Sequence, residues 1–137
     1  MIKASCLSFS VNNSKPEQLI DGFSFDYTTK TKVDIDNTLL FIQLKIDISA
    51  AIAGDEAKHK AASFDFGFTY EVDNLEQLIQ DVEGHRELDR TLHMSVLGIA
   101  FSTARGIILT KAANTIIQDA YLPIVNPSHL LDPNFQI

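Results

Sequence analysis

The stretch Leu39-Leu40-Phe41-Ile42-Gln43-Leu44-Lys45-Ile46-Asp47-Ile48-Ser49 decides the fold of this chain, because its apolar side chains recur at every second position. When the period is two, successive side chains point to opposite faces of a β-strand. One face would carry Leu40, Ile42, Leu44, Ile46 and Ile48, and the other Phe41, Gln43, Lys45, Asp47 and Ser49. The stretch therefore predicts a long strand with one buried face, which the rest of the chain must cover.

Three other runs in the first half of the chain alternate in the same way. They are Cys6–Val11, Thr28–Asp36 and Phe64–Tyr70, and polar residues at 12–16, 36–38 and 53–60 break the pattern between runs. Short polar connections are typical of antiparallel strands, whereas parallel strands need long crossovers. The first half of the chain therefore predicts a four-stranded antiparallel sheet.

The first run contains the only cysteine of the chain. Its alternation predicts that Leu7, Phe9 and Val11 share the buried face, and that Cys6 lies with the neighbouring serines on the exposed face of an edge strand. A single cysteine cannot form an internal disulfide, and no histidine partner is evident. We interpret Cys6 as an incidental thiol rather than a nucleophile.

The second half of the chain changes to a helical pattern. Asp73-Asn74 predicts a cap before a short helix over Leu75–Ile79, which ends by Glu83-Gly84. A long helix is predicted from about Leu88 to Thr115, because this range has no proline and its apolar residues recur at helical spacing. We therefore expect an α+β fold, with a four-stranded antiparallel sheet followed by a short and a long C-terminal helix packed on one face, in a single domain over residues 1–137.

Three small residues, Gly98, Ser102 and Gly106, are spaced four apart on the long predicted helix. Residues four apart lie on one side of a helix, and glycine in a helix interior costs about 1 kcal/mol relative to alanine. A packing reason is therefore expected for this stripe. Two interpretations remain open: the stripe packs on the chain's own sheet, or it contacts a partner helix in an oligomer.

The charge balance excludes some classes of partner. The chain has 18 acidic and 11 basic side chains, which gives a net charge of −7. Phosphate contacts need an excess of lysine and arginine, so we expect no nucleic-acid partner and no membrane partner. The N-terminus lacks the apolar run of a signal peptide, and no stretch approaches the apolar length of a membrane span. The sequence therefore predicts a cytoplasmic protein.

The residues that could carry chemistry are scattered along the chain. The histidines, His59, His85, His93 and His129, lie in different segments, and none is spaced to share a metal ion with another. The glycines form neither a dinucleotide-binding motif nor a P-loop. We predict that the protein is not an enzyme and that it holds no cofactor and no metal.

Apolar and aromatic residues without catalytic partners are the most unusual feature of the sequence. Large apolar surface patches usually mark binding sites. An exposed groove or oligomer contact would be lined by Phe41, Phe64, Phe66, Phe68, Tyr70, Leu75, Leu78, Ile79, Leu122, Ile124 and Val125. The alternative is that the aromatic residues of Phe64–Tyr70 are ordinary core beneath the long helix.

The segment Ile99–Ile107, together with Leu122–Leu131, resembles the bacterial export chaperone SecB and its SecB-like relatives. The likeness lies in an aromatic-small-Ala-Arg turn at Phe101–Arg105 and a Leu-Pro-apolar-Asn-Pro exit at Leu122–Pro127. The resemblance implies an ATP-independent holdase that binds unfolded polypeptide clients in apolar grooves and serves protein export. It also implies assembly as a homodimer or as a homotetramer made of two dimers. The candidate groove would then be the client-binding site.

The sequence departs from the family pattern near both ends. The family's second C-terminal helix would begin near Ser128, where we expect at most one turn, and we find no Cys/His-rich tail of the kind that binds zinc and contacts the SecA motor. The strand at Ser5–Val11 lacks the acidic residues of a SecA-docking face, so contact with a SecA-type motor stays open. A chaperone dedicated to a toxin–antitoxin or mobile-element system therefore remains an alternative, as do a non-catalytic oligomeric interaction module and a hotdog-type thioesterase or lipid-binding domain.

Overall fold

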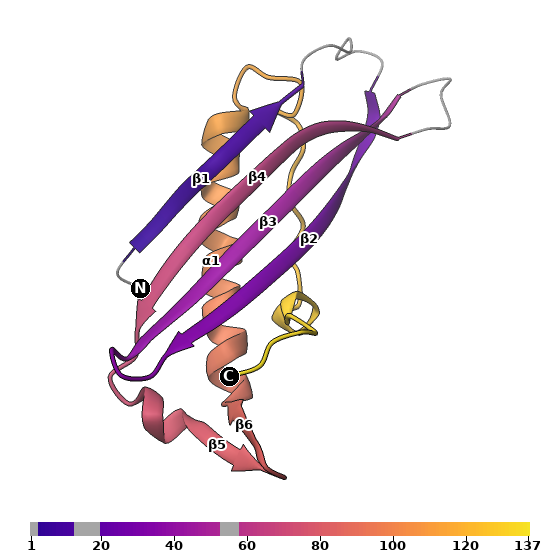
Figure 1. Ribbon diagram of the computed structural model, residues 1–137. Helices are drawn as coiled ribbons and strands as arrows, with labels where there is room; N and C mark the ends of the chain where they lie inside the picture. The colour runs from indigo at the N-terminus through magenta and orange to yellow at the C-terminus, as the bar shows by residue number, and fades with distance from the viewer. Residues whose placement is uncertain (1–2, 13–19, 53–57) are drawn as a thin grey trace.

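The computed structural model describes residues 3–12, 20–52 and 58–137. Its elements are β1 (Lys3–Val11), β2 (Ile20–Asp34), β3 (Leu39–Ile52), β4 (Lys58–Glu71), β5 (Ile79–Val82), β6 (His85–Leu88) and α1 (Arg90–Ala112), with single 3₁₀ turns at Leu75–Leu78 and Pro127–Leu130. Figure 1 shows the four long strands side by side with α1 lying across one face of their sheet. The α+β class, the four-stranded antiparallel sheet and the long C-terminal helix are confirmed.

The sheet has the strand order β1-β4-β3-β2, and all neighbouring strands are antiparallel. The strand with the clearest alternation, β3, therefore lies inside the sheet between β2 and β4. Its register places Ile42 opposite Phe68 of β4 and opposite Thr31 of β2. Because the side-chain period of a strand is two, this register brings the apolar positions of all three strands to the same face.

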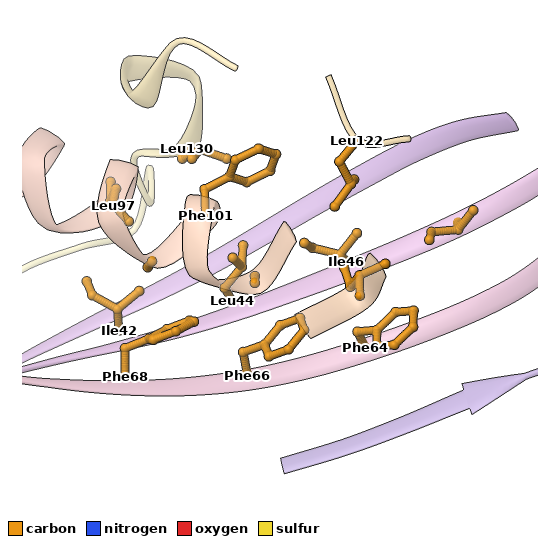
Figure 2. Close-up of a cluster of buried hydrophobic side chains, with 14 of the residues drawn as sticks. Ile42, Leu44, Ile46, Phe64, Phe66, Phe68, Leu97, Phe101, Leu122 and Leu130 are labelled. Atoms are coloured by element: carbon orange, nitrogen blue, oxygen red, sulfur yellow. The ribbon is translucent and has the colours of Figure 1, made fainter. Parts of the chain in front are cut away.

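The core lies between that face of the sheet and α1. Figure 2 shows the row Phe64, Phe66 and Phe68 on β4 beside Ile42, Leu44 and Ile46 on β3, with Leu97 and Phe101 of α1 opposite them. These eight side chains are at most 4 % exposed, and Leu122 and Leu130 of the C-terminal segment are buried with them. The C-terminal segment thus completes the cover that one helix alone does not provide.

Helix α1 is shorter than predicted at both ends. It begins after Asp89, which caps the helix by accepting a hydrogen bond from the Leu92 backbone nitrogen at 2.9 Å. By length and composition alone, α1 would be able to cross a membrane, which corrects the expectation that no stretch approaches that size. Eight residues of α1 are buried inside the protein, so this apolar character also follows from its place in the core.

The region between β4 and α1 differs from the sequence-based expectation. The short helix predicted over Leu75–Ile79 is a single 3₁₀ turn, and a small hairpin of β5 and β6 follows it. The two residues of the hairpin turn, Glu83 and Gly84, both have positive φ angles, of 50° and 82°. Such a turn matches the twist of antiparallel strands. The hairpin has mostly exposed polar side chains and therefore no alternating apolar signal.

Strands β1 and β2 also correct details of the prediction. In β1, Cys6 pairs with Phe66 and Ser8 pairs with Asp65, so Leu7 is an extra residue in a β-bulge. The bulge moves Leu7 to the outer face of the sheet and leaves Cys6, half-buried, on the core face with Phe9. Strand β2 begins at Ile20 rather than Thr28. The predicted breaks at 13–16 and 53–57 lie outside the described residues.

Candidate functional site

A large hollow lies along α1 on the side turned away from the sheet. One wall is the outward side of the helix, and the other is the extended segment that follows Leu122. The hollow, called the α1 groove below, has a volume of about 760 Å³ and is lined by Thr91, Met94, Ser95, Gly98, Ile99, Phe101, Ser102, Thr103, Arg105, Ile124, Val125 and Pro127.

Small residues on α1 allow the second wall to come close. A Cβ atom at Gly98 would lie 3.4 Å from the Cγ atom of Pro127, so the proline ring packs closely against the helix at position 98. Asn126 fixes the backbone there, because its side-chain oxygen accepts a hydrogen bond from the Ser128 nitrogen at 3.1 Å. The turn that begins at Pro127 then leads Leu130 into the core.

The segment after Leu122, called the C-terminal wall of the groove, is held at its end by polar contacts with β2. The hydroxyl of Thr29 donates a hydrogen bond to the Leu130 carbonyl oxygen, and the hydroxyl of Thr31 lies 2.8 Å from the His93 Nε2 atom of α1. The ring of Phe135 packs edge-on against His93, with the ring centroids 4.9 Å apart. Burial lowers the pKa of His93, which Asp132 opposes in smaller part. The wall is thus tied to both the sheet and the helix.

The groove offers mainly apolar contact. Ile99 is 50 % exposed and Ile124 is 89 % exposed, and among the described lining residues Arg105 is the only charged one. The hydroxyls of Ser95 and Thr103 donate hydrogen bonds to carbonyl oxygens of α1 itself, at 2.8 and 2.9 Å. These hydroxyl groups therefore impose few fixed hydrogen bonds on a ligand, and apolar side chains of many shapes would fit.

The structure separates the predicted site residues into several places. Ile124 and Val125 lie in the α1 groove together with Gly98 and Ser102 of the small-residue stripe. Gly106 lies further along the helix, and apart from its chain neighbours and the adjacent helix backbone no described atom would lie within 4 Å of a Cβ at this position. The stripe therefore does not pack on the sheet. One of its members contacts the C-terminal segment instead.

Most of the predicted aromatic residues are core. Phe64, Phe66, Phe68, Tyr70 and Leu75 are at most 3 % exposed, so they present no surface to a ligand in this structure. The rings of Phe64, Phe66 and Phe68 stack in a row beneath α1 with centroids 6.0 and 6.1 Å apart, as Figure 2 shows. This corrects the interpretation that these residues line an exposed groove. The alternative, core beneath the helix, matches their burial.

The remaining predicted residues lie apart from the α1 groove. Leu122 is buried behind the C-terminal wall, and Leu78 and Ile79 are half-buried beside the β5–β6 hairpin. Phe41 lies on the outer face of the sheet, opposite the helix face. The expected single groove is therefore not one continuous surface.

Met94 and Ile99 are among the groove residues that the sequence-based set lacked. Ile99 was named only as the first residue of the segment Ile99–Ile107, which resembles SecB-like chaperones. A signal was present, however, because Ile99 falls on the same side of the helix as Ser95, Ser102 and Gly106, out of phase with Leu97, Ala100 and Ala104. An apolar residue on an otherwise small, uncharged face indicates a contact surface.

No group of three or more His, Cys, Asp or Glu side chains that could hold a metal ion occurs among the residues described. The buried His93 is paired with Thr31 and packed against Phe135. Its surroundings thus explain its burial without a ligand.

No family model and no curated protein matches the sequence. A search of solved structures finds a SecB-like chaperone of Mycobacterium tuberculosis, Rv1957, in complex with a ChAD peptide from the antitoxin Rv1956 HigA1. The likeness covers 90 % of this chain and 84 % of that chain, at 13 % sequence identity and a TM-score of 0.46.

Proposed function

We propose that this protein is an ATP-independent holdase chaperone that holds apolar segments of non-native polypeptides in the α1 groove. The observation that carries the proposal is the chemistry of that groove, which is open, mainly apolar and lined by a single charged residue among those described. A surface of this kind binds exposed apolar side chains without a fixed hydrogen-bond pattern. The resemblance of Phe101–Arg105 and Leu122–Pro127 to SecB-like chaperones supports the same conclusion.

The dimensions of the groove suit a short extended segment. Its lining runs from Thr91 to Arg105, which is about 21 Å along the helix axis and matches about six extended residues. Each Å² of apolar surface buried contributes about 25 cal/mol, and the ordering of an unfolded client opposes that gain. One groove therefore binds weakly, and several grooves in one assembly would hold a client through avidity.

The edge of the sheet supports such an assembly. Strand β1 pairs with β4 only, so within the described chain its second edge has no strand beside it. This strand carries two exposed apolar side chains, Leu7 at 59 % and Phe9 at 49 %. Free strand edges with apolar side chains favour pairing with another chain. We therefore expect a homodimer or a dimer of dimers, measurable as the mass in light scattering at micromolar concentration.

The decisive experiment measures suppression of aggregation. Chemically denatured model substrate is diluted into buffer with and without the protein, in the absence of ATP, and light scattering is followed. The protein is expected to suppress scattering, and Ile99→Asp and Ile124→Asp are expected to weaken that effect. Val82→Asp is the matched control, because Val82 is an exposed apolar residue, 39 % exposed, that does not line the groove.

The outcome separates a groove function from a general surface effect. No suppression at a several-fold excess of assembled protein would contradict the holdase function. Equal loss in Ile99→Asp and Val82→Asp would place client binding outside the α1 groove. The mass of each variant is measured in parallel, so that a change in assembly is not mistaken for a change in client binding.

A further inference from the structure

The outer face of the sheet, turned away from α1, carries a second hollow that spans all four long strands. Its volume is about 450 Å³, its floor is formed by Leu7, Phe41 and Gly67, and Lys3, Lys30 and Lys32 stand around it. This outer-face hollow is independent of the α1 groove, because the two share no lining residue and lie on opposite sides of the molecule.

A glycine and a β-bulge build the floor. Gly67 leaves a gap in the outer face of β4, and the bulged residue Leu7 leans over it, with its Cδ1 atom 3.4 Å from the place of a Cβ at position 67. Phe41 on the next strand is 36 % exposed. The outer face of a sheet is usually polar when the other face is core. Burial in the core therefore does not explain why apolar groups lie on this face.

The register of the sheet places the lysines on opposite sides of this floor. Lys3 pairs with Thr69, Thr69 pairs with Phe41, and Phe41 pairs with Lys32, so these residues form one row across the sheet. Lys30 lies one row further along β2, on the same face as Lys32. Adjacent strands are about 4.8 Å apart, so the row is about 14 Å wide.

The three ammonium groups lack acidic partners in the described part of the chain. Its single salt bridge joins Lys60 to Asp47, at 3.6 Å. Asp65 lies on β4 next to Gly67 on the same face, and it accepts hydrogen bonds from the side-chain amide nitrogen of Gln43 at 3.1 and 3.3 Å. A local positive patch thus remains on a chain with a net charge of −7. Positive charge around an apolar floor complements a ligand that is both acidic and apolar.

We propose that the outer-face hollow docks an acidic, apolar polypeptide segment, in which large apolar side chains alternate with aspartate or glutamate. The apolar side chains cover Leu7 and Phe41, and the carboxylates pair with the lysines. A shallow hollow across four strands suits an extended chain better than a small molecule, which usually occupies an enclosed pocket. Asp34, Asp65 and Glu71 flank the patch on the same face, so the carboxylates of a ligand must lie at the lysines themselves. A short segment laid along the lysine row meets this condition, whereas a broad anionic surface such as a membrane would also meet the flanking carboxylates.

The test measures the binding of a fluorescein-labelled peptide, Asp-Leu-Asp-Phe-Glu-Leu-Asp, to the full chain by fluorescence anisotropy. The same peptide with lysine at each acidic position is the matched probe. The acidic peptide is expected to bind more tightly, and Lys30→Glu is expected to raise its Kd about tenfold. Lys45→Glu makes the same charge change on the same face outside the hollow, and is expected to alter the Kd by less than about twofold.

A second variant tests the apolar floor without changing the charge. Gly67→Val fills the hollow, and is expected to raise the Kd of the acidic peptide at least about fivefold while the chain stays folded, because valine favours strands. Val82→Asp, at an exposed residue that lines neither hollow, is expected to leave this Kd unchanged. Equal binding of both peptides, or equal effects of Lys30→Glu and Lys45→Glu, would overturn the proposal. Binding to vesicles of phosphatidylserine and phosphatidylcholine that Lys30→Glu abolishes would overturn the choice of a polypeptide partner.

Discussion

The Nε2 atom of His93 on α1 lies 2.8 Å from the hydroxyl oxygen of Thr31 on β2, and this buried contact joins the long helix to the edge of the sheet. Thr31 is flanked in the core by apolar residues, because it pairs with Ile42 on β3. On the same strand, Thr29 hydrogen-bonds to the Leu130 carbonyl. Two threonines on one strand therefore hold the two elements that cover the sheet.

Stability is expected to fall as the pH is lowered through the usual pKa of histidine. Burial lowers the pKa of His93 from 6.5, so the unfolded chain binds this proton more readily than the folded chain. The stabilisation is complete above about pH 6.5 and is lost as the pH falls toward the lowered pKa. Urea unfolding between pH 7.5 and 5.5 measures the effect, and His93→Gln should flatten it. The exposed His129→Gln is the control, and an unchanged slope in His93→Gln would contradict this role.

The helix–sheet contact is expected to depend on Leu97 and not on its neighbour Ile99. Leu97 is 1 % exposed, so Leu97→Ala should lower the free energy of unfolding by about 2–5 kcal/mol through lost burial and a cavity. Ile99→Ala removes a half-exposed side chain and should cost less than about 1 kcal/mol. Chemical denaturation of both variants makes the comparison. Similar losses would mean that the outward side of α1 is buried in the protein's working assembly.

Gly106→Ala is expected to stabilise the isolated chain by up to about 1 kcal/mol, because alanine has the higher helix propensity. Apart from its chain neighbours and the adjacent helix backbone, no described atom lies within 4 Å of the new methyl group. Thermal unfolding at low protein concentration measures this gain. The same substitution at Gly98 meets Pro127 at 3.4 Å, so its gain should be smaller. A loss of stability in Gly106→Ala that grows with protein concentration would indicate a second chain packed on this glycine.

Removal of the helix cap is expected to destabilise the start of α1. The side chain of Asp89 accepts a hydrogen bond from the Leu92 nitrogen, and Asp89→Ala should lower the free energy of unfolding by about 1 kcal/mol. Asp89→Ser keeps a capping oxygen and should recover most of the loss. The exposed Asp81→Ala in the β5–β6 hairpin is the control. Denaturation curves that coincide for Asp89→Ala and the unmodified chain would exclude a stabilising cap.

Local periodicity was sufficient for the main elements. The alternation in Leu39–Ser49 predicted β3 and its buried face, and helical spacing predicted α1 to within a few residues at each end. Each of these patterns can be recognised within a single strand or helix, because the direction of its side chains depends only on the local backbone repeat. The β5–β6 hairpin was missed for the same reason, since its polar strands carry no such repeat.

The residues of the candidate sites were predicted less completely than the main strands and helix. Phe64, Phe66 and Phe68 were offered both as groove and as core, and the alternation that placed them on one face could not say what covered that face. Ile124 was in the predicted groove set and lies in the lining of the α1 groove, whereas Ile99 on the opposite wall was not in that set. Which side of α1 the C-terminal segment follows depends on contacts such as that between Gly98 and Pro127, far apart in sequence.

The sequence by itself determined the class of fold, because burial of alternating and helically spaced apolar residues leaves few arrangements other than a sheet covered by a helix. Only the tertiary structure decided which surfaces remain open. The bulge at Leu7 shows the reason: one extra residue between Cys6 and Ser8 exchanges the faces of the side chains that precede it. That shift comes from pairing with β4, which is distant in sequence, and it places Leu7 over Gly67 on the outer face of the sheet rather than in the core.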